Sequence, residues 1–261
     1  MADDVTPTPQ PQPHMPPQPD SQPEPVRPLG IGSVIGRTFG IFFRNIVSFG
    51  IIAVLVYVPL VAFQLVTVDA AEQGYMKIAE FVLNLLLTSI LTAALVYGTI
   101  MDMRQGRRMG VGETVGRGFA LAIPVLLVTI VYSFLIGIGM ILLIIPGLIV
   151  MTILFVCVPA AVVERNGVAA SLSRSSALTR GNRWRVFGVI VILSLISIVL
   201  QFAVGAAVGA AQLGLVAAVI VLTVISAFSS ILYSIGGAVT YHDLRIIKEG
   251  GDIDQIAAVF D

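Results

Sequence analysis

The residues best suited to specific chemistry in this sequence are arginines, which gather in two short segments, one of them around the only tryptophan. A guanidinium group binds phosphate through several N–H donors, and each basic side chain near an anionic membrane surface contributes about 1 kcal/mol of binding. We therefore name eight candidate lipid-headgroup residues: Arg104, Arg107, Arg108, Arg174, Arg180, Arg183, Arg185 and Trp184. The simpler interpretation is that these arginines only fix the orientation of the chain in a membrane.

Residues for catalysis or metal binding are scarce. The chain has two histidines, His14 and His242, and one cysteine, Cys157, which lies in an apolar segment. It contains no HExxH, GxSxG or P-loop motif and no Cys/His cluster. The acidic residues that follow His242 fit no metal-ligand spacing, so we interpret them as a solvated tail: Asp243, Glu249, Asp252 and Asp254. We expect no enzymatic activity, no cofactor and no bound metal.

The composition indicates a lipid environment. Hydrophobic residues make up 57% of the 261 residues and charged residues only 11%, whereas soluble domains have roughly 25% charged residues. Residues 118–163 and 186–241 contain no Asp, Glu, Lys or Arg, and each stretch is long enough for two spans of about 20 residues. The formal net charge is zero, which gives no indication of nucleic-acid binding.

The hydrophobic segments predict an all-α, polytopic integral membrane protein whose six transmembrane helices form three hairpins. The predicted spans are about 46–68, 78–100, 120–143, 148–163, 186–208 and 214–241. The fourth is short, so a tilted or re-entrant segment is the alternative there. Every Lys and Arg except Lys77 falls on the side of the two termini. This positive-inside bias predicts a bacterial inner-membrane protein with both termini in the cytoplasm.

Basic amphipathic helices are predicted on the cytoplasmic face, before the odd-numbered spans. The segments GSVIGRTF at 32–39 and GETVGRGF at 112–119 share the pattern G-x-x-[VI]-G-R-x-F, and SLSRSSALTRGNRWRVF at 171–187 takes the same place before the fifth span. The chain is therefore interpreted as three repeated units, each a basic surface helix followed by a hairpin, with chance similarity as the alternative. Gly181 is expected to end the third surface helix and Asn182 to cap the next. Gly205, Gly209 and Gly214 are expected to permit a close helix contact.

Two terminal segments flank the predicted membrane domain of residues 29–245. Residues 1–28 hold most of the 14 prolines and no aromatic residue, which predicts a disordered cytoplasmic tail that a protein partner could bind. Residues 246–261 are predicted to form a second cytoplasmic tail with a short amphipathic helix, whose apolar positions are Ile253, Ile256, Ala257 and Phe260.

The segment VVERNGVAASLSRSSALTRGNRWRVFG resembles the glycerophosphoryl diester phosphodiesterase membrane-domain family of bacterial polytopic proteins. In that family a glutamate ends a span and an S-x-x-L-T-x-G-x-x-W-x-x-F-like pattern follows; the matching residues here are Glu164, Ser175, Leu178, Thr179, Gly181, Trp184 and Phe187. The sequence Tyr241-His242-Asp243-Leu244-Arg245, followed by Glu249-Gly250, is similar to the family's Y-x-D-L-R…E-G ending.

The resemblance covers roughly residues 30–255 and implies a membrane location and fold. It does not imply catalysis, because the phosphodiesterase chemistry of the family belongs to a separate soluble domain whose histidine and carboxylate set is missing from this sequence.

Two functions fit these observations best, ahead of a membrane enzyme. The first is a non-enzymatic membrane protein that interacts with lipid or serves as a platform for a partner; the alternative is a transporter or permease for small molecules or lipids. Polar residues within the spans separate the two: Gln64, Asn84, Thr88, Ser89, Thr92, Gln201, Gln212, Ser226, Ser229, Ser230, Tyr233 and Ser234. A water-accessible cavity that reaches mid-membrane beside Asn84, Gln201 or the hydroxyl cluster at 226–234 favours transport, whereas a dry centre packed with Leu, Val and Ile favours the platform. The sequence predicts no oligomeric state.

Overall fold

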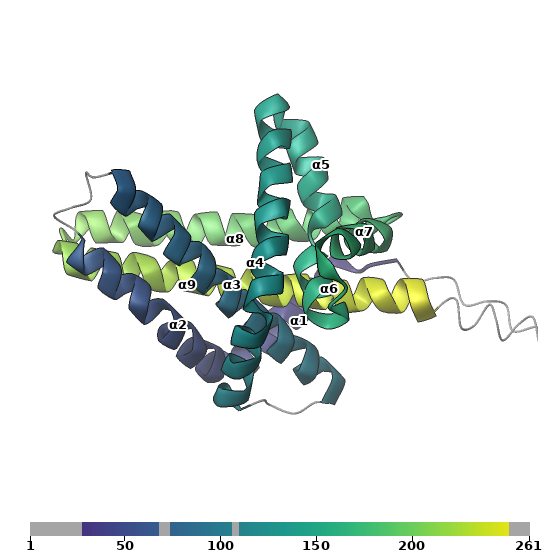
Figure 1. Ribbon diagram of the computed structural model, residues 1–261, viewed down its shortest axis with the longest axis horizontal. Helices are drawn as coiled ribbons and strands as arrows, with labels where there is room; N and C mark the ends of the chain where they lie inside the picture. Colours follow the sequence, from purple (N-terminus) through teal and green to yellow (C-terminus); the bar gives the residue numbers. More distant parts are fainter. Residues whose placement is uncertain (1–27, 68–73, 106–109, 251–261) are drawn as a thin grey trace, which may run out of the picture.

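The computed structural model describes residues 28–67, 74–105 and 110–250, and every regular element in these ranges is a helix (Figure 1). Six segments are long and apolar enough to cross a membrane. They are α2 (Ile46–Val66), α3 (Gly74–Gln105), α4 (Val111–Leu142), α5 (Ile144–Leu154) with α6 (Cys157–Glu164), α8 (Arg183–Ala210) and α9 (Leu215–Arg245). The chain is therefore an all-α, multi-pass membrane protein, and each predicted span corresponds to one of these segments.

Two further helices, α1 (Ile31–Arg44) and α7 (Gly167–Thr179), lie beside the spans. α1 packs on α8 and α9, while α7 packs on α4, α5 and α6. We call the end of the molecule where α1 and α7 meet the last turns of α3 and α9 the basic end, because Arg37, Arg44, Arg174 and Arg245 lie there. The predicted tails at 1–27 and 251–261 and the residues Arg107 and Arg108 lie outside the described ranges.

Several element boundaries differ from the sequence prediction. The segment 112–119 is not a separate surface helix, because α4 runs unbroken from Val111 to Leu142. The chain reverses at Leu143, which has extended backbone angles, and not at Pro146-Gly147. Pro146 lies in the first turn of α5, where a missing N–H is tolerated. At the other end of the chain, helical structure continues past residue 245 as a π-helix over Ile246–Gly250.

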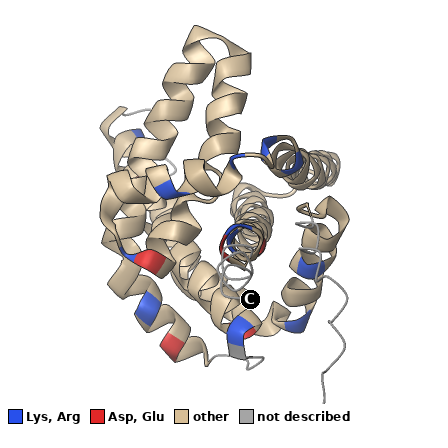
Figure 2. Cartoon of the chain, turned by 90° about the vertical axis from the view of Figure 1, so that its right-hand side faces the viewer, with Lys and Arg blue, Asp and Glu red and all other residues tan. Residues whose placement is uncertain are grey.

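Figure 1 shows α8 and α9 running together along the long axis, with the α4–α5 hairpin projecting away from them. The charged residues lie away from the tip of this hairpin, which is uncharged (Figure 2). Close approach of α4 and α5 depends on two glycines, because a Cβ added to Gly139 would lie 2.8 Å from the Cα of Gly147. No close helix contact forms at Gly205, Gly209 or Gly214 among the described residues, since a Cβ on any of them would meet nothing within 4 Å, although the chain does turn back there between Ala210 and Leu215.

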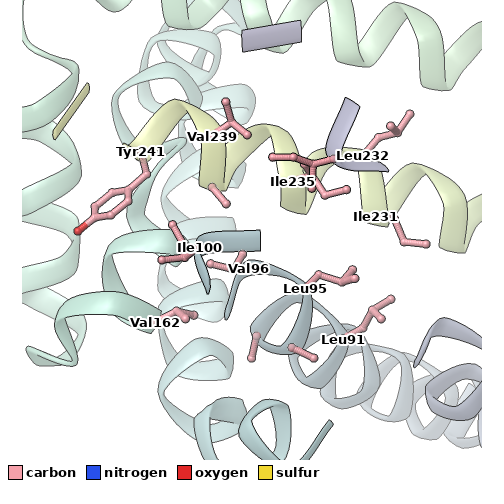
Figure 3. Close-up of a cluster of buried hydrophobic side chains, with 14 of the residues drawn as sticks. Leu91, Leu95, Val96, Ile100, Val162, Ile231, Leu232, Ile235, Val239 and Tyr241 are labelled. Carbon is pink, nitrogen blue, oxygen red and sulfur yellow. The ribbon is translucent and has the colours of Figure 1, made fainter. Parts of the chain in front are cut away.

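The centre of the bundle is the contact between α3 and α9 (Figure 3). Leu91 and Leu95 of α3 are fully buried, as are Leu232 and Ile235 of α9. Small residues bring a third helix close, since a Cβ on Gly236 would lie 2.6 Å from Leu193 of α8. Membrane helices commonly pack through such small residues, because lipid supplies no hydrophobic force between helices.

The buried positions agree with three repeated units. Residues 30–45, 110–125 and 167–182 align without gaps, and each segment carries an arginine at the same place: Arg37, Arg117 and Arg174. The structure buries equivalent positions in all three helices: Val34, Thr114 and Ser171; Thr38, Gly118 and Ser175; and Ile41, Leu121 and Leu178. This shared buried face favours a true repeat over chance similarity.

The same alignment explains why only the second unit has a continuous helix. Asn45 and Asn182 stand where the first and third surface helices give way to a span, and asparagine favours helix ends. The equivalent residue in the second unit is Val125, which is buried inside α4. Gly181, with a φ of 87°, adopts the left-handed conformation predicted for the end of α7.

The fourth span is broken into α5 and α6 at Phe155-Val156. Pro159 has no N–H to donate to the carbonyl of Phe155, so the helical hydrogen bonding is interrupted there. In the last turn of α5, the carbonyl of Ile153 accepts a hydrogen bond from the hydroxyl of Ser175 at 2.8 Å. The hydroxyl of Thr179 lies 3.3 Å from the same carbonyl, and its single proton is shared with the carbonyl of Ser175, 2.9 Å away in α7. Both residues are fully buried on one face of α7. The α7 helix therefore supplies hydroxyl groups at a break that lipid could not hydrate.

Removing these two hydroxyls should destabilise the junction of α5, α6 and α7. For the variant with Ser175→Ala and Thr179→Val, we expect a loss of about 1–3 kcal/mol, because a buried carbonyl is left without its hydroxyl donors. Thermal unfolding of the purified protein in detergent measures this loss. Ser173→Ala, at an exposed position of the same helix, is the matched control. Equal stability of the double variant and this control would show that the two hydroxyls do not support the break.

Candidate functional site

Ion pairs at the basic end join the surface helices to the ends of the hairpins. The last turns of the three hairpins carry Asp102 on α3, Glu164 on α6 and Asp243 on α9. Arg37 of α1 pairs with Asp243, and Arg44 at the end of α1 pairs with Asp102. Both aspartates are buried, so each carboxylate requires its arginine.

Arg174 of α7 is the centre of the largest ionic group. Its Nε lies 2.6 Å from Glu164 Oε1, and its Nη2 pairs with Glu249. Glu249 also contacts Arg245 at 2.5 Å, and the hydroxyl of Tyr241 donates to Glu164 at 2.8 Å. Burial by itself would lower the pKa of Arg174, but the hydrogen bonds that it donates to Glu164 and Glu249 raise its pKa above the ordinary value. Arg174 is therefore a permanently charged structural residue.

This ionic group gathers residues that carry the family resemblance. Glu164, Tyr241, Arg245 and Glu249 are far apart in the sequence and meet around Arg174. Ser175 and Thr179, from the same pattern, form the hydroxyl contacts to the break between α5 and α6. The matching residues thus hold the fold together at the basic end.

The structure divides the predicted headgroup residues into two groups. Arg174 is engaged in ion pairs, and Arg185 donates from Nη1 to the carbonyl of Leu29 at 3.1 Å. Four others are exposed and form no ion pair with any described residue: Arg104, Arg180, Arg183 and Trp184. Among the described candidates, the exposed group is the one available for a lipid headgroup.

Arg183 and Trp184 border an apolar groove of about 310 Å³ between the start of α8 and α5. The groove is lined on one side by Ile145, Leu148 and Ile149. Trp184 is 85% exposed and forms an edge-to-face contact with Phe187, with the ring centroids 6.2 Å apart. A cationic group beside an aromatic ring and a hydrocarbon surface is a combination suited to the membrane interface.

An open pocket of about 420 Å³ lies between α3, α4, α6, α8 and α9, and because serine and threonine side chains line part of it we call it the hydroxyl-lined cavity. It lies near the middle of the spans, because Thr88 and Thr92 are central in α3 and Ser229 and Ser230 are central in α9. Its other polar lining residues are Tyr132, Gln201, Ser226, Tyr233 and Ser234. Its volume is within the range of small-molecule sites, roughly 300–1,000 Å³.

Most serines of this cavity do not form hydrogen bonds between helices. Ser226, Ser230 and Ser234 donate to carbonyls one turn earlier in α9 itself. Contacts across helices among the described residues include Ser194 with Tyr233 at 2.5 Å, Tyr57 with Thr88 at 3.4 Å, and a long one from Gln201 to Ser229 at 3.5 Å. The hydroxyl oxygens therefore keep acceptor positions that a ligand can use.

A second polar pocket, of about 390 Å³, lies between α2, α3 and α9 and is lined by Gln64, Glu80 and Asn84. It shares Ser226 with the hydroxyl-lined cavity. Along α3, Glu80, Asn84, Thr88 and Thr92 follow one another at intervals of four residues, so they occupy one face of the helix. We call this row of side chains, together with Ser226 and Ser230 of α9, the polar stripe.

An apolar groove of about 570 Å³ adjoins the second polar pocket. It lies between α2 and α9, and it shares Tyr57 and Thr223 with that pocket. Its remaining lining is almost entirely hydrocarbon and includes Val61, Leu65 and Phe228. A polar pocket beside an apolar groove fits a molecule with a polar head and a hydrocarbon tail.

Sequence reasoning missed several residues of these sites. Glu80 was not singled out because it is the third residue of the predicted span at 78–100, close to Lys77 in the preceding loop. Tyr57 and Tyr132 are isolated in apolar segments, where an aromatic residue gives no functional signal. The interval of four residues from Glu80 to Thr92 is the pattern that could have identified the stripe.

Exchanging the charges of Arg37 and Asp243 tests the ionic lock at the basic end. We expect Arg37→Asp or Asp243→Arg alone to cost about 2 kcal/mol, less than a fully buried pair because the Arg37 side chain is partly exposed to solvent. The double exchange should restore most of the loss in thermal unfolding. Arg165→Asp, at an exposed position in left-handed conformation, is the control. A double variant as unstable as the sum of the single variants would contradict the pairing.

Comparisons with known proteins add no relative: no family model, no curated protein and no solved structure matches the chain. The resemblance to the glycerophosphoryl diester phosphodiesterase membrane-domain family stays a prediction, and function must be inferred from the cavities and the charged end.

Proposed function

We propose that this chain is a non-enzymatic protein of the bacterial inner membrane that moves amphipathic molecules between the two leaflets. The basic end faces the cytoplasm, in keeping with the positive-inside bias. The polar head of the substrate passes along the polar stripe between α3 and α9, and its hydrocarbon tail stays in the apolar groove or in lipid.

The observation that supports this proposal is the hydroxyl-lined cavity at mid-membrane. Polar groups are costly in the hydrocarbon region of a bilayer, and polar residues inside membrane proteins mark substrate pathways. The cavity and the second polar pocket share Ser226 as a lining residue, and polar side chains line the two pockets from Glu80 to Ser234. A pathway of this kind lowers the barrier that a polar headgroup meets in hydrocarbon.

The partner platform is less well supported. The sequence criterion for the platform is a dry centre packed with Leu, Val and Ile, and the contact between α3 and α9 is packed in this way at Leu91, Leu95 and Leu232. Beside Gln201 there is a cavity instead, and Ser226, Ser230 and Ser234 bond within their own helix.

A second role, retention of an anionic lipid, is favoured by the groove beside Trp184. We propose that Arg180 and Arg183 contact the phosphate and that one acyl chain lies against Ile145 and Leu148. Each arginine near the headgroups contributes about 1 kcal/mol to such binding.

Filling the cavity should stop lipid movement. The full chain is reconstituted in vesicles that contain a phospholipid with a fluorescent acyl chain, and bleaching by dithionite reports the lipid that reaches the outer leaflet. We expect Ser230→Trp to slow this movement by about tenfold or more, because a large side chain occupies the path of the headgroup. Val199→Trp, on an exposed apolar position of α8, is the matched control and should leave the rate unchanged. Wild-type vesicles that move lipid no faster than protein-free vesicles would refute the proposal.

Lipid retention by the arginines is tested by mass spectrometry of lipids that co-purify in native nanodiscs. Replacing Arg180 and Arg183 by Gln and Trp184 by Ala should remove most of the enrichment of phosphatidylglycerol and cardiolipin over bulk membrane, since no charged group then faces the phosphate. Lys77→Gln, at the opposite end of the spans, should not change it. If the lipid content is unchanged and the variant instead inserts with altered topology, these arginines only orient the chain.

A further inference from the structure

We infer that Glu80 is a selectivity residue for substrates whose polar head carries an ammonium group. This inference rests on the proposed function and specifies the substrate class. It comes from the hydrogen-bonding capacity left over in the second polar pocket, between α2, α3 and α9.

The carboxylate of Glu80 is the charged group among the described residues that line this pocket. Gln64 donates from Nε2 to Glu80 Oε1 at 2.7 Å, which fixes the orientation of the Gln64 amide. The carbonyl oxygen of Gln64 is buried and has no donor among the described residues. The carboxylate of Glu80 accepts the hydrogen bond from Gln64 and can accept others.

Neutral side chains of the pocket can both donate and accept hydrogen bonds: the amide of Asn84 and the hydroxyls of Tyr57 and Thr223. The charge of the pocket is more selective. None of its described lining residues is an arginine or lysine, and Lys77, one turn earlier in α3, is exposed and forms no ion pair with a described residue. The negative charge of Glu80 therefore favours a group that carries positive charge.

The size of the pocket selects among cations. A volume of about 390 Å³ is far larger than a single metal ion requires and accommodates a small organic head. Tyr57 lines the same pocket and offers an aromatic ring, to which quaternary ammonium groups bind favourably. A primary or quaternary ammonium group fits both the carboxylate and the ring.

The adjoining groove indicates what the ammonium group is attached to. Tyr57 and Thr223 line both the polar pocket and the apolar groove of about 570 Å³. A ligand with its ammonium at Glu80 can therefore place a hydrocarbon chain along Val61 and Leu65. Two sources supply this chemistry, an ammonium-headed phospholipid and a soluble single-chain amine.

Two fluorescent lipids that differ in the headgroup test the inference. In vesicles with the full chain, phosphatidylcholine carries an ammonium group, and phosphatidylglycerol carries a neutral glycerol in its place. We expect wild-type protein to move phosphatidylcholine about tenfold faster than phosphatidylglycerol, and Glu80→Gln to abolish that difference by slowing phosphatidylcholine alone. Glu80→Asp should keep part of the preference. Glu113→Gln, an exposed acid in the first turn of α4, is the control.

The outcomes separate this inference from the proposed function. Equal rates for the two lipids in wild-type protein would overturn ammonium selection by the phospholipid route and leave lipid movement standing. Decyltrimethylammonium then decides on the soluble source: inhibition of lipid movement that Glu80→Gln abolishes supports it, and inhibition independent of Glu80 overturns the inference.

If neither lipid moves, the proposed function fails, and native mass spectrometry decides on the site alone. Retention of phosphatidylcholine over phosphatidylglycerol that is lost in Glu80→Gln would support an ammonium site without transport. Equal retention would overturn it.

Discussion

The constraint on which the structure depends is the neutralisation of carboxylates that end the hairpins at the basic end. Asp102 and Asp243 are buried, and Glu164 is nearly so, which makes each unstable without a cation. The arginines that meet them come from surface helices of the repeat, and they connect different units: Arg37 of the first unit pairs with Asp243 of the third, and Arg174 of the third with Glu164 of the second. The pair of Arg44 and Asp102 lies within the first unit. Arg117 of the second unit lies over the ring of Tyr97, 5.7 Å from its centroid. The first and last units are thereby joined, although 206 residues separate Arg37 from Asp243.

The ionic group around Arg174 also accounts for the position of the hydroxyl-lined cavity. Arg174 and the buried hydroxyls of Ser175 and Thr179 fix α7 against the break between α5 and α6. The α4–α5 hairpin can then project away from α8 and α9 while α6 stays close to them (Figure 1). Side chains of α3, α6 and α9 surround a space that they do not fill, at the place where the α4–α5 hairpin diverges from α8 and α9. The serines of α9 can line this space because their hydroxyls donate to carbonyls of the same helix.

The sequence predicted the parts of this structure that depend on local composition. Long uncharged segments located the six spans, and Gly181 and Asn182 marked the end of α7 and the start of α8, because glycine and asparagine adopt the required backbone conformations. It did not predict the parts that depend on partners. Arg174 and Arg180 look alike in sequence, yet one is held between two glutamates and the other is exposed. Glu80 resembled a loop charge, and only its contact with Gln64, from another helix, makes it part of a pocket.

The two ends of α3 therefore differ in a way that bears on function. At the basic end, Oδ2 of Asp102 is paired with Arg44, and its buried Oδ1 has no donor among the described residues. Toward the other end, the carboxylate of Glu80 lines a pocket without a described arginine or lysine, and the buried carbonyl oxygen of Gln64 has no donor among the described residues. An unsatisfied buried acceptor costs about 1–3 kcal/mol. What distinguishes the Glu80 end is that its carboxylate lines a pocket of about 390 Å³, large enough for a ligand. The unmatched acceptors are consistent with a site that a cationic head completes, and the four-residue spacing of polar side chains along α3 leads from that site to the cavity at mid-membrane.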